Sequence, residues 1–298
     1  KRTAFLVAEG VAGILSPSAC PRGDSGSVCV GGPMQGEGSR DPKDPTLLPQ
    51  IVLASEQYGR ILRTLEKKLP VVIEADVKVT HDDADQMSFN VIAELPGTDK
   101  ADDVVILGAR CGSGHAGTGA THNGASSAVM MEALRILKAS GLKPRRTIRM
   151  ALWGGEEQGL LGSRAYVKDH FADRETMALK PDHGKLAAYF NMDNGGGAFR
   201  GIYMEHNDAA RHVVAAWMEP FRGLGMATVA PGPTSGTDHM AFDAVGLPGF
   251  QFIQDPLEYS SRTHHTNQDV YERLIPEDLR TNAVIIASFA YHAAMRDE

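Results

Sequence analysis

The sequence contains few cysteines and no long apolar run. Three cysteines are too few for a disulfide framework; Cys20 and Cys29 flank a loop rich in Pro, Gly and Ser, and they either pair in an oxidising compartment or stay reduced. No stretch approaches the roughly 18 apolar residues that a membrane helix needs, so we expect no membrane insertion. Hydrophobic residues still make up 42% of the chain. This fraction excludes a disordered chain and predicts a globular protein with a sizeable core.

Basic residues are also fewer than acidic residues in this sequence. The formal net charge is −7, which argues against a nucleic-acid-binding protein, because such proteins concentrate positive charge on one surface. The one local basic run, 143–149, flanks Pro144 without aromatic partners, and we interpret it as a solvated turn before a strand. The sequence begins at Lys1 without an apolar signal region, so we expect a processed or truncated piece of a longer protein.

The first 70 residues differ from the rest in amino-acid composition and hydrophobic pattern. Gly, Pro, Ser and Asp dominate up to position 46. A strand and a helix are then predicted between residues 48 and 70, with Ile61, Leu62 and Leu65 on one helical face and Pro70 at the end. We therefore place a small lobe at residues 1–70.

From Val71 onward, strand-like runs alternate with helical patterns. This alternation predicts a three-layer α/β domain over residues 71–298, with helices on both faces of a largely parallel central sheet. The expected strands are 71–79, 88–95, 102–109, 147–153, 186–192 and 249–253, and the expected helices are 125–140, 208–222 and a last one from Pro276.

Acids and histidines follow several of these strands. In sheets of this kind, ligands bind beyond the carboxyl ends of the strands, so these positions predict a site at one edge. The residues are Arg110, Cys111, His115 and His122 after the strand 102–109, Glu156 and Glu157 after 147–153, Asp193 after 186–192, and His264 and His265 after 249–253.

The glycine-rich segment 108–124 resembles a nucleotide site only superficially. Gly112, Gly114 and Gly117 spell G-x-G-x-x-G, but helical spacing begins only near Ala125, and the acidic residue that should follow is absent. No serine stands in the G-x-S-x-G turn of a serine hydrolase. We interpret Cys111 as an ordinary loop thiol rather than a nucleophile.

Two adjacent carboxylates, Glu156 and Glu157, indicate the chemistry of the site more clearly than the glycine-rich segment does. They follow an apolar strand and precede "QGLLGS", which favours a partly buried position. Adjacent side chains at a strand end point in different directions, so one can bind a metal while its neighbour activates water.

Four segments resemble the M28 family of zinc peptidases: "ALWGGEEQGLLGSRAYV", "FNMDNGG", "SGTDHMAFDAVGLPGFQF" and "RTHHTNQDVYERL". The resemblance covers residues 71–298, and the segment before it resembles the tail of a protease-associated domain, a β-rich lobe, that is inserted in one branch. It implies an αβα zinc-peptidase fold, hydrolysis of small peptides in the manner of aminopeptidases, dipeptidases or carboxypeptidases, and an extracellular or periplasmic location. A homodimer would also fit.

The family pattern implies a two-zinc site. Glu157, Asp193 and His265 match three of its ligands, and Glu156 matches the general base. The glycine-rich segment departs from the pattern, because Arg110 stands in place of a ligand histidine, Gly112 in place of the aspartate that supports it, and His122 in place of the bridging aspartate.

These departures predict at most one zinc ion. A neutral imidazole cannot offset two dications as a shared carboxylate does, but His122, Glu157 and His265 still supply a His2Glu set with an open water position. Asp193 loses its metal, and we expect it to pair with Arg110. We therefore expect a weakened peptidase or amidohydrolase; the alternative is a catalytically inactive homologue with a binding or structural role.

The resemblance also places Asp238 and His239 in a wall of the substrate pocket, although Asp238 fits equally well as a helix N-cap. Arg110 would favour a substrate with an anionic end group. Trp153 and Trp217 are expected in the core or in the pocket wall.

Overall fold

The computed structural model describes residues 2–18, 41, 43–45, 47–80, 82, 84–113 and 117–297. The chain divides into two compact units. The smaller comprises residues 1–87, 115–117 and 260–269, and the larger comprises 88–114, 118–259 and 270–298. The assignment of residues 1–70 to a protease-associated lobe stays a prediction. Cys20, Cys29 and His115 lie outside the described residues.

The described residues of the smaller unit include two α-helices and a short parallel pair of strands. These are α1 (Arg2–Ala8), β1 (Ile14–Pro17), β2 (Gln50–Leu53) and α2 (Ser55–Glu66). The predicted helix is α2, but it ends at Glu66 instead of Pro70. Of its expected apolar face, Leu62 and Leu65 are exposed.

The expected strand over residues 71–79 is wrong. These residues form neither helix nor strand. Val72, Val77 and Val79 are 94%, 53% and 69% exposed, so their side chains gain almost no burial. Alternating β-branched residues favour a strand only where a neighbouring strand and a core face are available, and this segment finds neither.

A seven-stranded sheet forms the centre of the larger unit, in the order β10-β9-β11-β8-β4-β5-β3. The four consecutive strands β11, β8, β4 and β5 are parallel, β3 runs antiparallel to β5, and β9 runs antiparallel to β11. The sequence did not predict β9 and β10. The strands are β3 (Val91–Leu95), β4 (Lys100–Arg110), β5 (Arg146–Trp153), β8 (Leu186–Asn191), β9 (Phe199–Tyr203), β10 (Thr228–Ala230) and β11 (Gly249–Gln254), beside a small hairpin of β6 (Ala172–Asp173) and β7 (Ala178–Leu179).

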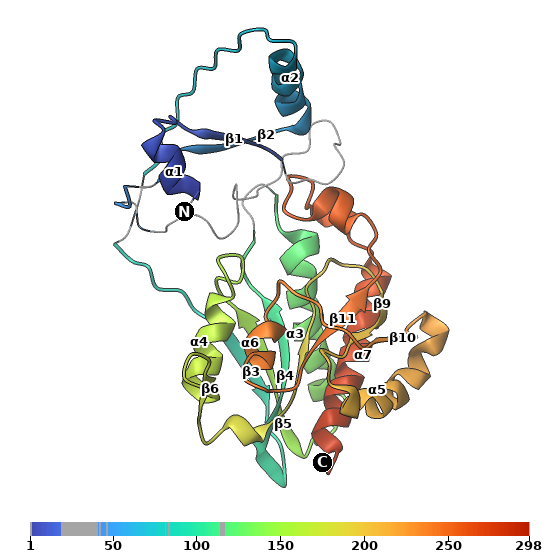
Figure 1. The fold of residues 1–298 in the computed structure, drawn as a ribbon. Coiled ribbons are helices and arrows are strands. Elements are labelled where there is room, and N and C mark those ends of the chain that lie inside the picture. Colours follow the sequence, from blue (N-terminus) through green and yellow to red (C-terminus); the bar gives the residue numbers. More distant parts are fainter. Residues whose placement is uncertain are drawn as a thin grey trace. The chain divides into compact units, whose positions relative to one another are not determined.

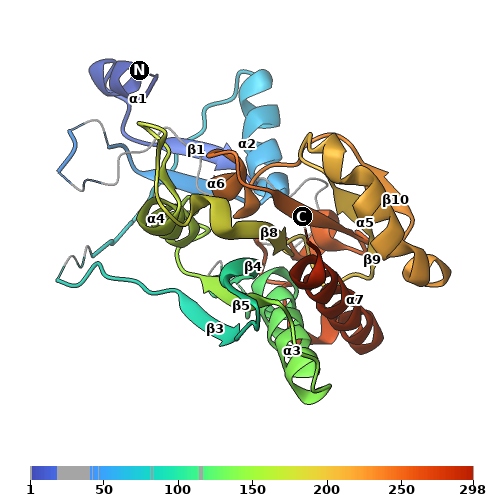
Figure 2. The same cartoon turned by 90° about the horizontal axis from the view of Figure 1, so that it is seen from below.

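Helices cover both faces of this sheet, as Figures 1 and 2 show. One face is covered by α3 (Ala125–Ala139), α5 (Arg211–Met218) and α7 (Pro276–Met295), and the other by α4 (Leu161–His170) and α6 (His239–Asp243). The three-layer α/β architecture with a mostly parallel sheet is therefore confirmed. Short helical turns are His183–Lys185, Asp208–Ala210, Glu219–Leu224 and Tyr271–Arg273, with π-helical turns at Ala120–Gly124 and Tyr259–Thr263.

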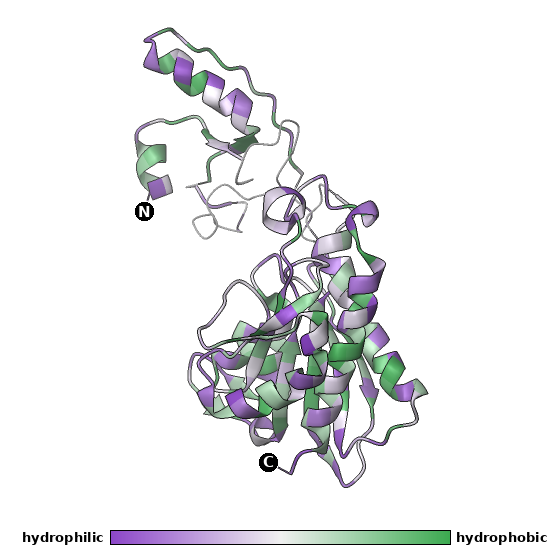
Figure 3. Ribbon diagram, turned by 90° about the vertical axis from the view of Figure 1, so that its right-hand side faces the viewer, coloured by the Kyte–Doolittle hydropathy of each residue, from purple (hydrophilic) through white to green (hydrophobic). Residues whose placement is uncertain are grey.

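The alternation of side chains along β4 divides the core into two layers. Val105 and Leu107 pack in the larger cluster with α3 and α7, whereas Val104 and Ile106 pack in the cluster beneath α4 and α6. Figure 3 shows the hydrophobic colouring of the sheet between its helices. Trp153 belongs to the second cluster and is a core residue. Within the described part of the chain, no helix is both long and apolar enough to span a membrane.

Candidate active site

Four of the residues singled out by sequence meet at the carboxyl edge of the larger unit's sheet. Arg110 is the last residue of β4, Glu156 and Glu157 follow β5, and Asp193 follows β8. Parallel neighbouring strands end at the same edge, which brings these side chains together. Arg110, Glu156 and Asp193 are only 3%, 4% and 3% exposed. We call these four residues the carboxylate edge.

The guanidinium of Arg110 lies among the three carboxylates. Its Nη2 is 2.5 Å from Asp193 Oδ1, so the ion pair expected from the sequence is present. Its Nη1 donates a hydrogen bond to Glu156 Oε2 and lies 3.5 Å from Glu157 Oε1. Burial opposes a charged arginine, but the negative charges of Asp193 and Glu157 outweigh it and raise the pKa of Arg110 above its ordinary value. Arg110 is therefore a permanent buried cation.

His122 lies beside the same carboxylates. It belongs to the π-helical turn Ala120–Gly124 before α3 and is 2% exposed. Its Nδ1 is 3.4 Å from Glu157 Oε1, and its Nε2 is 3.5 Å from Asp193 Oδ1. Asn123 of the same turn donates a hydrogen bond to Glu157 at 3.5 Å. The two imidazole nitrogens thus face two different acids.

These donor atoms fit a metal ion on the His122 side only. Two atoms bound to one tetrahedral zinc at about 2.1 Å lie about 3.4 Å apart, and His122 Nδ1 and Glu157 Oε1 have this separation. Near Glu156 and Asp193, the guanidinium of Arg110 already fills the space among the oxygens. A guanidinium has no acceptor and cannot be a ligand.

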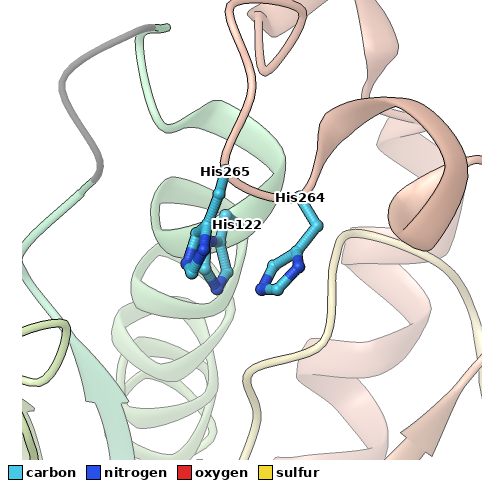
Figure 4. A group of neighbouring side chains, drawn as sticks. All are labelled: His122, His264 and His265. Carbon is cyan, nitrogen blue, oxygen red and sulfur yellow. The ribbon is translucent and has the colours of Figure 1, made fainter. Parts of the chain in front are cut away.

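The third predicted ligand, His265, lies in the smaller unit. Its ring stacks on that of His264 with 3.9 Å between the centroids. Figure 4 draws both histidines and His122 as sticks. The predicted set of His122, Glu157 and His265 combines residues of two units and stays a prediction.

Asp238 and His239 are buried at the start of α6. Ser163 Oγ donates to Asp238 Oδ1 at 2.5 Å, and His239 Nε2 lies 3.4 Å from Glu205 Oε1. Asp238 occupies the N-cap position but makes no capping hydrogen bond with its side chain. Burial raises its pKa to about 7, against the opposing hydrogen bond from Ser163. The predicted role of Asp238 and His239 in substrate binding stays a prediction.

Cys111 has the environment of an ordinary thiol. Burial raises its pKa above the usual value, which is the opposite of the shift that activates a nucleophile. Its Sγ also lies 3.3 Å from the carbonyl oxygen of Trp153 and donates to it.

Sequence reasoning missed Tyr259. Its ring meets the ring of His122 edge-on, with centroids 5.4 Å apart and planes at 72°. Gly195, two residues after Asp193, has a φ of +95°, and a Cβ there would lie 2.8 Å from the Tyr259 ring. Tyr259 follows β11, so its place after a parallel inner strand is the signal that could have found it.

Comparison with known proteins gives one consistent family. The chain is 28% identical over 257 residues to carboxypeptidase Q of Mus musculus, covering 86% of this chain and 51% of that protein. It is also 28% identical over 220 residues to aminopeptidase YwaD of Bacillus subtilis (strain 168), covering 72% of this chain and 46% of the relative. The chain therefore spans about half the length of the curated relatives it matches.

Solved structures with a similar fold include peptidases of the same kind. A peptidase M28 precursor from Shewanella amazonensis SB2B has a TM-score of 0.77 at 30% identity, covering 97% of this chain and 62% of that one. A zinc aminopeptidase from Bacillus subtilis shares the fold, with a TM-score of 0.56 at 24% identity over 70% of this chain and 50% of the other. The family model described as "Peptidase family M28" matches residues 90–290. The chain belongs to peptidase family M28.

Proposed function

We propose that this chain is part of a zinc-dependent peptidase or amidohydrolase of small peptides, with a weakened site for one zinc ion. The observation that carries the proposal is the pair Glu156 and Glu157 beside the buried His122, at the carboxyl edge of an M28 sheet. Relatives named as a carboxypeptidase and an aminopeptidase support peptides as the substrate class.

In this proposal His122, Glu157 and His265 would hold the ion. A bound zinc supplies a Lewis acid and lowers the pKa of a bound water. Glu156 would accept the proton from water and pass it to the leaving amine. Arg110 already donates to Glu156 Oε2, so the base would have to use the remaining lone pairs of its carboxylate. This restriction supports low activity.

The resemblance adds three further proposals: an extracellular or periplasmic location, a homodimer, and substrate contacts from Asp238 and His239. The expected contact of Arg110 with an anionic substrate has less support, since its terminal nitrogens face three carboxylates and the residue is 3% exposed.

A second candidate function is a non-catalytic homologue. The observation that favours it is the contact of one arginine with both the predicted base, Glu156, and the predicted ligand, Asp193. Such a protein would keep the fold and the pocket of a peptidase without its turnover.

Hydrolysis of a dipeptide panel, with and without added zinc, separates the two. We expect slow turnover that a chelator abolishes and that Glu156→Gln lowers by about 10²-fold or more, because a positioned base contributes at least that factor. Glu132→Gln is the matched control, since Glu132 is exposed and pairs with Arg135 on α3. Turnover that resists both the chelator and Glu156→Gln would refute the mechanism. No turnover at any zinc concentration would support the non-catalytic homologue.

A further inference from the structure

We infer that Arg110 takes the place of a metal ion at the carboxylate edge, so that the negative charge of this half of the site is partly offset by a residue of the chain itself. The family resemblance implies a metal ion beside Asp193, whereas in the structure an arginine side chain lies there. Asp193 and Glu156 contact the guanidinium of Arg110 with carboxylate oxygens that a metal ion in this position would need as ligands.

Charge and lone pairs both exclude a metal in that position. The guanidinium carries a permanent positive charge, which repels a dication, and it uses the carboxylate oxygens that would otherwise coordinate. The negative charges of Asp193 and Glu157 keep the arginine charged despite its burial.

The backbone of Arg110 is held by the sheet and by a neighbouring helix. Arg110 pairs with Trp153 in the parallel ladder between β4 and β5. Ser127 of α3 donates its hydroxyl to the carbonyl oxygen of Arg110 at 2.7 Å. A strand and a helix therefore hold the backbone of Arg110, and the three carboxylates contact its guanidinium.

This inference deepens the proposed function but is independent of zinc on the His122 side. It predicts that removing the guanidinium frees the oxygens of Asp193 and Glu156 and makes the set of acids more negative, so that it attracts cations more strongly. Changing Arg110 to a residue with a metal-binding nitrogen should therefore create a zinc site that the parent protein lacks.

The first experiment compares bound zinc by equilibrium dialysis and metal analysis in the parent and in Arg110→His. We expect one more zinc ion per chain in the variant than in the parent, whatever the parent binds. Arg146→His is the matched control. Arg146 is the first residue of β5, is also buried at 6% exposure, and its Nε lies 3.4 Å from Oδ2 of Asp103 in β4. Equal zinc content in the folded variant and the parent would overturn the inference.

A second variant covers the case in which Arg110→His fails to fold. Thermal unfolding of Arg110→Ala, with and without zinc, should show a lower midpoint than the parent without zinc. Added zinc should raise the midpoint of the variant by more than it raises that of the parent, because the parent shift reports the His122 side alone. A parent-like midpoint without zinc, or equal zinc shifts in both proteins, contradicts the replacement of a metal by Arg110. A parent without zinc or turnover would refute the proposed function but leave this inference intact.

Discussion

At the scale of single residues, one substitution in the glycine-rich segment controls the chemistry of the edge. Arg110 brings a fixed cation to a place where the family resemblance implies a histidine ligand, and its contacts reach Asp193, Glu156 and Glu157. The sequence predicted the pair with Asp193. It did not predict the hydrogen bond to Glu156, because only the packing of β4 beside β5 brings the two together.

Asp238 gives a prediction about pH. Its pKa is raised to about 7 by burial, so its protonated form favours the folded state. Its contribution to stability is complete below its ordinary pKa of 3.8 and is lost as the pH rises through about 7. We therefore expect the free energy of unfolding of the parent to fall between about pH 5 and about pH 8 by more than that of Asp238→Asn.

Denaturant unfolding at the two pH values measures this difference. Asp76→Asn serves as control, because Asp76 is exposed and pairs only with a neighbouring exposed lysine, Lys78. An equal pH dependence in the parent and in Asp238→Asn would show that Asp238 does not titrate in this range.

At the scale of elements, the approach of β4 to β8 depends on a glycine. A Cβ at Gly108 would collide with the hydroxyl of Tyr189, which accepts a hydrogen bond from Trp153 Nε1 at 2.9 Å and donates to Asn191 Oδ1 at 2.6 Å. Tyr189 is fully buried and held by both bonds, so it cannot move aside without breaking them.

We expect Gly108→Ala to lower the free energy of unfolding by about 1–3 kcal/mol, the usual cost of overpacking a core. Chemical denaturation of the variant measures the loss. Gly184→Ala is the control, because no atom lies within 4 Å of the position that its Cβ would take. A loss no larger than that of the control would mean that the sheet accommodates the methyl group.

At the scale of the whole molecule, an extended segment before the larger unit is exposed. Residues 72–80 have no helix or strand and are exposed throughout. Exposed backbone outside regular structure is the preferred site of proteolysis. We expect limited digestion with thermolysin to cut within residues 71–80 before it cuts any strand of the central sheet, and mass spectrometry of the first fragments tests the order. First cuts within β4 or β5 would contradict it.

The sequence by itself determined the architecture of the larger unit and the identity of its chemical groups. Apolar strands alternating with amphipathic helices can bury their faces only in three layers, and acids placed after parallel strands must share one edge. The tertiary structure decided which of these groups touch. Residues 71–79 have strand-forming composition but no partner strand. Strand β9 forms beside β11, and β10 forms beside β9. Tyr259 reaches His122 because the turn after β11 brings it there. Contacts between segments distant in sequence depend on packing and register, which no local pattern of residues encodes.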